Sequence, residues 1–152
     1  MRWSCPGRPR RRPTFIPTFG LIGRKGYFRS NFKYKTMDKL KQTIEAAWED
    51  RSLLKDAATQ AAIRELIDLL DKGTLRVAEP GAESWQVNDW VKKGVVLYFP
   101  IQQMETIEVG PFEFNDKIPL KKDYAAKGVR VVPHAVARHG AFLEEGVIMM
   151  PS

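Results

Sequence analysis

The chain has 152 residues, of which 43% are hydrophobic and 28% are charged, and this composition is typical of one globular domain of ordinary size. No apolar run approaches the ~20 residues that a membrane-spanning helix needs, so we expect no membrane partner. The formal net charge of +7 comes from residues 1–37, which hold ten Lys and Arg and no acidic residue, while the remainder is slightly acidic. Because the basic residues lie outside the predicted domain, we expect no nucleic-acid-binding domain.

Residues 1–36 contain four prolines and scattered glycines and show no helical or strand period, so they predict a basic, disordered or non-native extension. Three origins are open: translated sequence upstream of a true start at Met37, an Arg-rich organellar transit peptide, or an RNA-binding arm with aromatic residues among the basic ones. The only cysteine, Cys5, lies here, so no intramolecular disulfide forms. A cysteine-free domain fits the cytoplasm, with organellar targeting as the lesser alternative.

Two helices are predicted after Met37. The first covers residues 38–50, with Asp38 near its start, where an acidic side chain suits the helix dipole. The second runs from about Thr59, its expected N-cap, to Lys72, and Gly73 ends it. Their apolar stripes are Leu40, Ile44, Ala47 and Trp48 in the first helix, and Ala62, Ile63, Leu66, Ile67 and Leu70 in the second.

Residues 75–87 alternate apolar and polar side chains about Pro80-Gly81, which predicts a β-hairpin with a five-residue connection. The segment 88–99 is compatible with a helix capped by Asn88 or with a buried strand, and we favour a helix ended by Pro100.

A short strand is expected around Ile107 and Val109, followed by a loop over residues 110–123. The tryptophans of the domain are assigned to the core, because burying their large apolar area is enough to explain them. They are Trp48, Trp85 and Trp90.

A six-residue repeat begins after Arg130. Val136, Phe142 and Ile148 are spaced six apart, and Gly140 and Gly146 lie two places before the last two. This period is typical of a left-handed parallel β-helix, in which each hexad forms one face, an apolar residue points inward once per face and a small residue fits each corner. Because stable arrays need about three or more repeats, we expect the chain to be a piece of a longer protein.

Residues 37–152 resemble the N-terminal region of the tetrahydrodipicolinate N-succinyltransferase family. The resemblance rests on LLDKGTLRVAEP, WVKKGVVLYFPI, FNDKIPL and GVRVVPHAVARHGAFLEEGVIMMPS. It implies a small N-terminal α/β (α+β) domain with two or three helices and a β-hairpin over residues 37–128, and the start of a left-handed β-helix over 129–152. It also implies a homotrimer with active sites between neighbouring β-helices.

The implied activity is transfer of a succinyl group from succinyl-CoA, a co-substrate, to the amino group of the ring-opened dicarboxylate 2-amino-6-oxopimelate. This reaction belongs to lysine and diaminopimelate biosynthesis, and no bound cofactor is expected. Arg130 matches the family's substrate-binding arginine, and a guanidinium can hold a carboxylate through two parallel hydrogen bonds. The catalytic residues and the CoA surface would lie beyond Ser152, so the chain alone is expected to be inactive.

Other polar residues carry weaker signals. His134 and His139 do not share a helical face and lack an evident third ligand, so no metal site is predicted. Lys92-Lys93 and Lys121-Lys122 carry charge suited to CoA phosphates, but we interpret them as ordinary surface lysines. Glu144-Glu145 is expected at a solvated corner. The alternative functions are nucleic-acid binding through residues 1–36 and a related hexapeptide acyltransferase with another acceptor.

Overall fold

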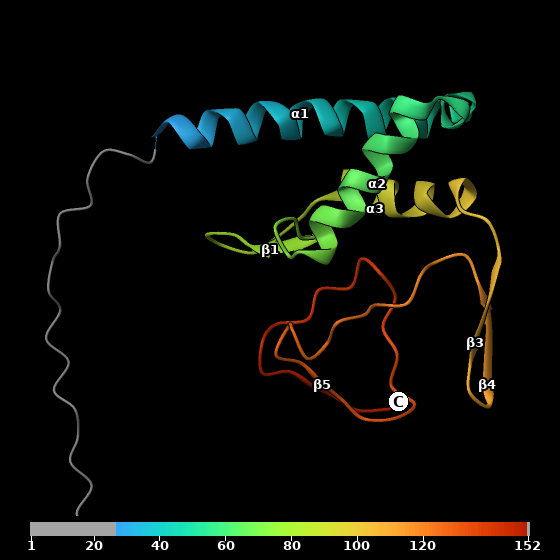
Figure 1. Ribbon diagram of the computed structural model, residues 1–152. Coiled ribbons are helices and arrows are strands. Elements are labelled where there is room, and N and C mark those ends of the chain that lie inside the picture. The colour runs from blue at the N-terminus through green and yellow to red at the C-terminus, as the bar shows by residue number, and fades with distance from the viewer. Residues whose placement is uncertain (1–26, 152) are drawn as a thin grey trace, which may run out of the picture.

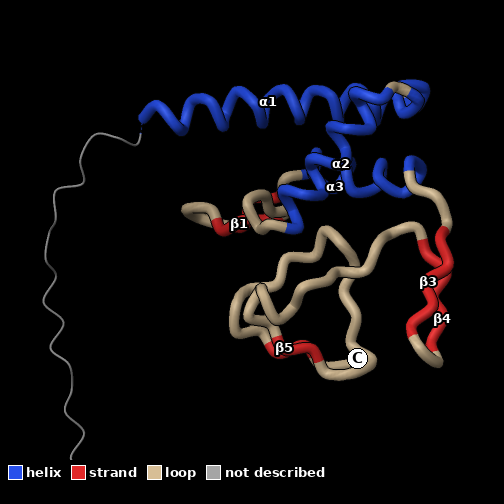
Figure 2. Tube along the Cα trace, in the orientation of Figure 1, coloured by secondary structure: helices blue, strands red, loops and turns tan. Residues whose placement is uncertain are grey.

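The computed structural model describes residues 27–151, which form a layer of helices above a largely irregular C-terminal part (Figures 1 and 2). The helices are α1 (Tyr27–Glu49), α2 (Ala57–Asp71) and α3 (Asp89–Tyr98), with 3-10 turns at Arg51–Lys55 and Phe99–Ile101. The strands form three pairs: β1 (Ala78–Pro80) with β2 (Trp85–Val87), β3 (Glu105–Val109) with β4 (Phe112–Asp116), and β5 (Arg130–Val131) with β6 (Ile148–Met149). This arrangement agrees with the coarse prediction of a small domain with helices and a hairpin.

The first helix starts earlier than expected. It begins at Tyr27, so the prediction that residues 1–36 lack helix is wrong for 27–36. The four prolines all precede residue 18 and the last glycine of the segment is Gly26, so nothing in 27–36 breaks a helix that continues into Met37. The three interpretations of the basic extension concern residues that lie mostly outside the described part of the chain.

Helix α2 is capped by a residue other than the expected one. The N-cap is Asp56, whose carboxylate accepts hydrogen bonds from the backbone N–H of Thr59, at 2.9 Å, and from its hydroxyl, at 3.1 Å. Thr59 is therefore the third residue of the helix and not its N-cap. Its backbone N–H has no acceptor within the helix, and the Asp56 carboxylate provides one. The predicted end is confirmed, because Lys72 is the C-cap and Gly73 follows with φ of 69°.

The helix over 88–99 is confirmed as α3, and a 3-10 turn containing Pro100 follows it. Asn88 occupies the N-cap position, but its side chain donates to Arg76 O instead of capping the helix. The hairpin is also confirmed, with its first strand shifted to Ala78–Pro80. Trp85 is 67% exposed, so its assignment to the core is wrong, whereas Trp48 and Trp90 are partly buried against the core.

A second hairpin occupies part of the expected loop. The strand around Ile107 is confirmed as β3, but residues 112–116 form β4, which pairs with β3 through a tight turn at Gly110-Pro111. Gly110 has φ of 57°, which a two-residue hairpin turn requires and glycine adopts freely. The glycine and proline signals therefore marked a turn between two strands, and not a long loop.

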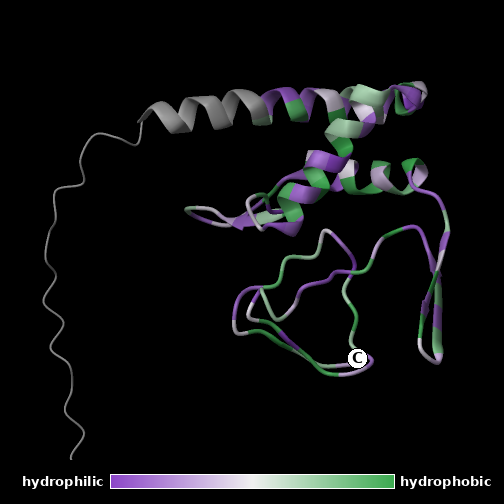
Figure 3. Ribbon diagram, viewed as in Figure 1, coloured by the Kyte–Doolittle hydropathy of each residue, from purple (hydrophilic) through white to green (hydrophobic). Residues whose placement is uncertain are grey.

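The core lies between the three helices, and Figure 3 shows hydrophobic residues along α3. Its fully buried large side chains are Ile44, Ile63, Leu66, Val91 and Leu97. Each contributes roughly 1.5–3 kcal/mol relative to exposure. Helix α3 approaches α2 closely at Gly94, where a Cβ atom would lie 2.7 Å from Leu66 Cδ1. In the part of the chain that the structure describes, no helix is long and apolar enough to cross a membrane.

Residues 128–151, called the coil here, turn at every sixth residue. A positive φ occurs at Gly128 (64°), His134 (77°), Gly140 (99°) and Gly146 (85°). The chain then returns beside itself, because β5 and β6 pair in parallel with Arg130 opposite Ile148, three six-residue units later. The corners expected at Gly140 and Gly146 are therefore present as backbone turns.

The inward positions of the coil differ by one residue from the prediction. Val136 and Ile148 are 54% and 57% exposed, and Phe142 is turned toward α2. The half-buried set lies one position later, at Val131, Ala137, Leu143 and Met149. Successive side chains of an extended segment point to opposite faces, so a shift of one residue exchanges inside and outside. Both sets share the same period, which is why the sequence alone did not distinguish them.

Candidate functional site

Arg130 is the first residue of β5, and its side chain is exposed. Its backbone N–H donates to Val147 O at 2.9 Å, so the parallel pairing of the coil fixes the position of this residue. None of the ion pairs among residues 37–151 involves Arg130. Its guanidinium is therefore able to bind a carboxylate through two hydrogen bonds. The substrate-binding role stays a prediction.

A polar cluster connects the last turn of α2 to the coil, and we call it the Asp71 cluster. Lys121 Nζ donates to Asp71 Oδ1 at 2.5 Å, and the backbone N–H of Gly140 donates to the same oxygen at 2.9 Å. The His139 ring lies between two carboxylates, with Nε2 2.9 Å from Asp68 Oδ1 and Nδ1 3.4 Å from Asp71 Oδ1. Asp68 and Asp71 are three residues apart and so share a face of α2.

Burial makes the Asp71 cluster important for stability. The side chains of Lys121 and Asp71 are 2% and 15% exposed. Burial by itself would raise the pKa of Asp71, but hydrogen bonds from Lys121 and Gly140, together with the charges of Lys121 and His139, outweigh it and lower the pKa below its ordinary value. Asp71 is therefore a carboxylate at neutral pH, and removing one partner would leave a buried charge unpaired.

An aromatic contact reinforces the same junction. Gly73 presents no side chain to the coil, and a Cβ atom there would lie 2.7 Å from the ring of Phe142. The Arg76 guanidinium also lies against this ring, 4.4 Å from its centroid. Phe142 therefore fills the space at the end of α2, which explains why it does not point into the coil.

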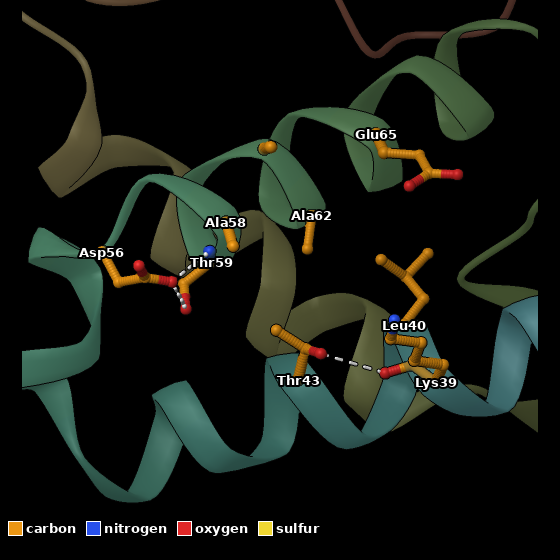
Figure 4. Close-up of a pocket in the computed structure, with 9 residues that line it drawn as sticks. Lys39, Leu40, Thr43, Asp56, Ala58, Thr59, Ala62 and Glu65 are labelled. Atoms are coloured by element: carbon orange, nitrogen blue, oxygen red, sulfur yellow. Dashed lines mark hydrogen bonds between the residues drawn. The ribbon is translucent and has the colours of Figure 1, made fainter.

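Two of the hollows within the described residues have volumes in the range of binding sites. The larger, of about 600 Å³, lies between α1 and α2 and is lined mainly by small side chains (Figure 4). Its Asp56 carboxylate faces Thr59 as the N-cap, and Thr43 donates to Lys39 O, so neither group is aimed at a ligand. The second, of about 370 Å³, adjoins the Asp71 cluster and mixes three lysines with three carboxylates. Neither gathers groups that would perform acyl transfer.

The structure settles several weaker sequence signals. Lys121 is buried and paired with Asp71, so its assignment as a surface lysine is wrong, whereas Lys122 is exposed as expected. Glu144 is exposed as expected and lies 3.7 Å from Arg76. Asp68 and Asp71 were missed, because their spacing in α2 indicates a shared face but not what that face contacts. No group of three or more His, Cys, Asp or Glu suited to a metal occurs within the described residues.

Known proteins are similar to a large part of this chain. Residues 39–101 match the family model of the tetrahydrodipicolinate N-succinyltransferase N-terminal domain. The chain is 48% identical over 126 residues to the 2,3,4,5-tetrahydropyridine-2,6-dicarboxylate N-succinyltransferase of Aeromonas hydrophila, covering 76% of this chain and 46% of the relative. Residues 39–101 are therefore similar to the N-terminal domain of tetrahydrodipicolinate N-succinyltransferases.

Other relatives that carry the same name align to the same extent. The protein of Leptothrix cholodnii is 49% identical over 125 residues, which cover 75% of this chain and 46% of the relative. The protein of Methylorubrum extorquens is 44% identical over 124 residues, which cover 74% and 44%. The chain thus spans about half the length of the curated relatives that it matches.

Proposed function

We propose that the chain forms the N-terminal part of an enzyme that transfers the succinyl group of succinyl-CoA to the amino group of 2-amino-6-oxopimelate, the ring-opened form of tetrahydrodipicolinate. The observation that carries this proposal is the 48% identity over 126 residues with a relative named for that activity. The reaction would serve lysine and diaminopimelate biosynthesis in the cytoplasm.

Residues 129–152 would begin a left-handed parallel β-helix. Two features support this proposal: a positive φ recurs every six residues from Gly128 to Gly146, and β5 pairs with β6 three six-residue units apart. Val136, Ile148 and Met150 are exposed, and a neighbouring subunit would cover this apolar surface.

Arg130 would bind a carboxylate of the acceptor. The exposed guanidinium at the start of β5, without an ion-pair partner among residues 37–151, supports this role. The remaining machinery, including the succinyl-CoA surface, would lie in further β-helix coils and between the subunits of a homotrimer. Since acyl transfer depends on holding both reactants in geometry, we expect no turnover by these 152 residues alone.

A chimaeric enzyme tests the proposal. Residues 37–151 are joined in register to the C-terminal half of the Aeromonas hydrophila relative, and release of free CoA thiol is measured with succinyl-CoA and tetrahydrodipicolinate. We expect turnover by the chimaera and none by the 152-residue chain. A folded chimaera without acceptor-dependent CoA release, or robust turnover by the short chain, would contradict the proposal.

The same chimaera tests Arg130. Replacing Arg130→Ala should raise the KM for the acceptor roughly 10- to 100-fold, because a charge-assisted hydrogen-bonded pair is lost. Arg130→Lys should recover part of the affinity. Lys122→Ala is the matched control, since Lys122 is also an exposed cation near the coil and should leave the KM unchanged. Equal effects of Arg130→Ala and Lys122→Ala would rule out a specific role.

A further inference from the structure

The β3–β4 hairpin contacts the coil at two points. At its tip, the ring of Phe112 meets the imidazole of His134 edge-on, with centroids 5.4 Å apart and planes at 86°. At its base, Asp116 Oδ2 lies 2.8 Å from Arg138 Nε. Both points fall within coil residues 134–138. An isolated two-stranded hairpin is only marginally stable in water, so these contacts decide where it lies.

The two attachments differ in strength. The base is held by a charged hydrogen bond and by the chain itself, which continues from Asp116 to Leu120, where Leu120 pairs with Arg138. The tip is held by a single aromatic contact between Phe112, which is 48% exposed, and His134, which is also exposed. The tip is therefore the end that opens more easily.

His134 is exceptional among the corners of the coil. The other three corners, Gly128, Gly140 and Gly146, have the residue type that adopts a positive φ without steric cost. His134 adopts φ of 77° although its Cβ atom disfavours that conformation. The side chain that makes this corner unfavourable is the same one that contacts Phe112, so a strained backbone coincides with a specific contact.

We propose that the β3–β4 hairpin is a hinged arm, latched at its tip by His134 against Phe112 and hinged at its base by Asp116 and Arg138. Release of the latch swings the tip away and uncovers His134, the corner that follows Arg130, while Arg138 stays paired with Asp116. The strained corner keeps the latch weak, so that the arm opens without unfolding the helices. This inference does not depend on the proposed enzymatic activity.

Hydrogen exchange of the 152-residue chain, followed by mass spectrometry, tests the latch. Asn tolerates a positive φ and lacks an aromatic ring, so His134→Asn removes the contact and preserves the corner. We expect amides of residues 106–115 to exchange roughly 3- to 10-fold faster, the range that an edge-to-face aromatic contact implies. Amides in α2 and α3 should be unaffected.

Further variants separate a latch from a general effect on stability. Phe112→Ala should accelerate the same peptides, and the double variant should add nothing to either single one, because both remove one contact. Glu113→Ala, at the exposed neighbouring position of β4, is the control and should match the unsubstituted chain. Unchanged hairpin exchange in both single variants, or equal acceleration in the helices, would overturn the proposal.

Discussion

The helical unit and the coil are stabilised in different ways. The helices bury Ile44, Ile63, Leu66, Val91 and Leu97 completely between themselves. Among the described residues of the coil, Val129, at 6% exposed, is the only hydrophobic residue that is buried, and Val136 and Ile148 are exposed. The helical unit therefore closes its own core, while the coil depends on its attachment to α2.

That attachment consists mainly of polar contacts. Asp71 Oδ1 accepts hydrogen bonds from Lys121 and from the backbone of Gly140, and Phe142 packs at Gly73. A single coil has too little apolar surface to bury by itself, so directed contacts to a neighbouring element replace the core. If this comparison is correct, substitutions in the two regions should produce different unfolding behaviour.

Asp71→Ala should have the largest effect. It leaves the buried Lys121 ammonium unpaired and removes the acceptor of Gly140 N–H, which costs about 3–5 kcal/mol. Hydrogen exchange should show the coil losing protection while α1 and α3 keep theirs. Glu65→Ala, at an exposed position of the same helix, is the control. Retained protection in the coil would show that the Asp71 cluster is not its main attachment.

Ile63→Ala should cost about 2–5 kcal/mol, because it opens a cavity where Ile63 is fully buried. Unlike Asp71→Ala, it should reduce the protection of helices and coil together, since α2 supports both. Urea unfolding monitored by circular dichroism, combined with exchange, measures the two effects. Loss of protection in the helices with an intact coil would contradict the dependence of the coil on α2.

Gly73→Ala should destabilise the junction by about 1–2 kcal/mol, the cost of a side chain at a positive φ. The added Cβ atom would also displace the ring of Phe142. The thermal midpoint should fall, and Lys72→Ala, whose backbone is right-handed helical, should change it little. Equal midpoints for the two variants would show that the left-handed turn does not limit stability.

Mild acidification should change the stability of the coil less than any of these three substitutions. The folded-state pKa of Asp71 is lowered, so its stabilisation is complete above the ordinary pKa, ~3.9, and is lost as the pH falls through the folded value. Hydrogen bonds from Thr59 lower the pKa of Asp56 in the same direction within the helical unit. In Asp71→Asn, the hydrogen-exchange protection of the coil should therefore depend less on pH between pH 5 and 2. The pH dependence of protection in the helices should be unchanged. An unchanged profile in the coil would contradict this assignment.

The sequence predicted correctly those elements that depend on interactions between residues close together in the chain. The 3.6-residue period located α2 and α3, and Gly73 marked the end of α2. The misassignments arose where two interpretations share one local pattern. A glycine and a proline at 110–111 fit both a loop and a hairpin turn, and an apolar residue every six positions fits two phases that differ by one. The exposure of Trp85 depends on what surrounds the first hairpin, which the sequence does not specify.

The sequence by itself determined α2, α3, the first hairpin, the resemblance to the tetrahydrodipicolinate N-succinyltransferase family and the six-residue spacing of the coil. These features depend on side-chain periodicity and on residues with restricted or permissive backbones, which act within a few positions along the chain. The tertiary structure decided which apolar set faces inward, that Lys121 is buried, and that Asp68 and Asp71 meet His139. These contacts join residues about 50 to 70 positions apart, and only the packing of the coil against the end of α2 brings them within hydrogen-bonding distance.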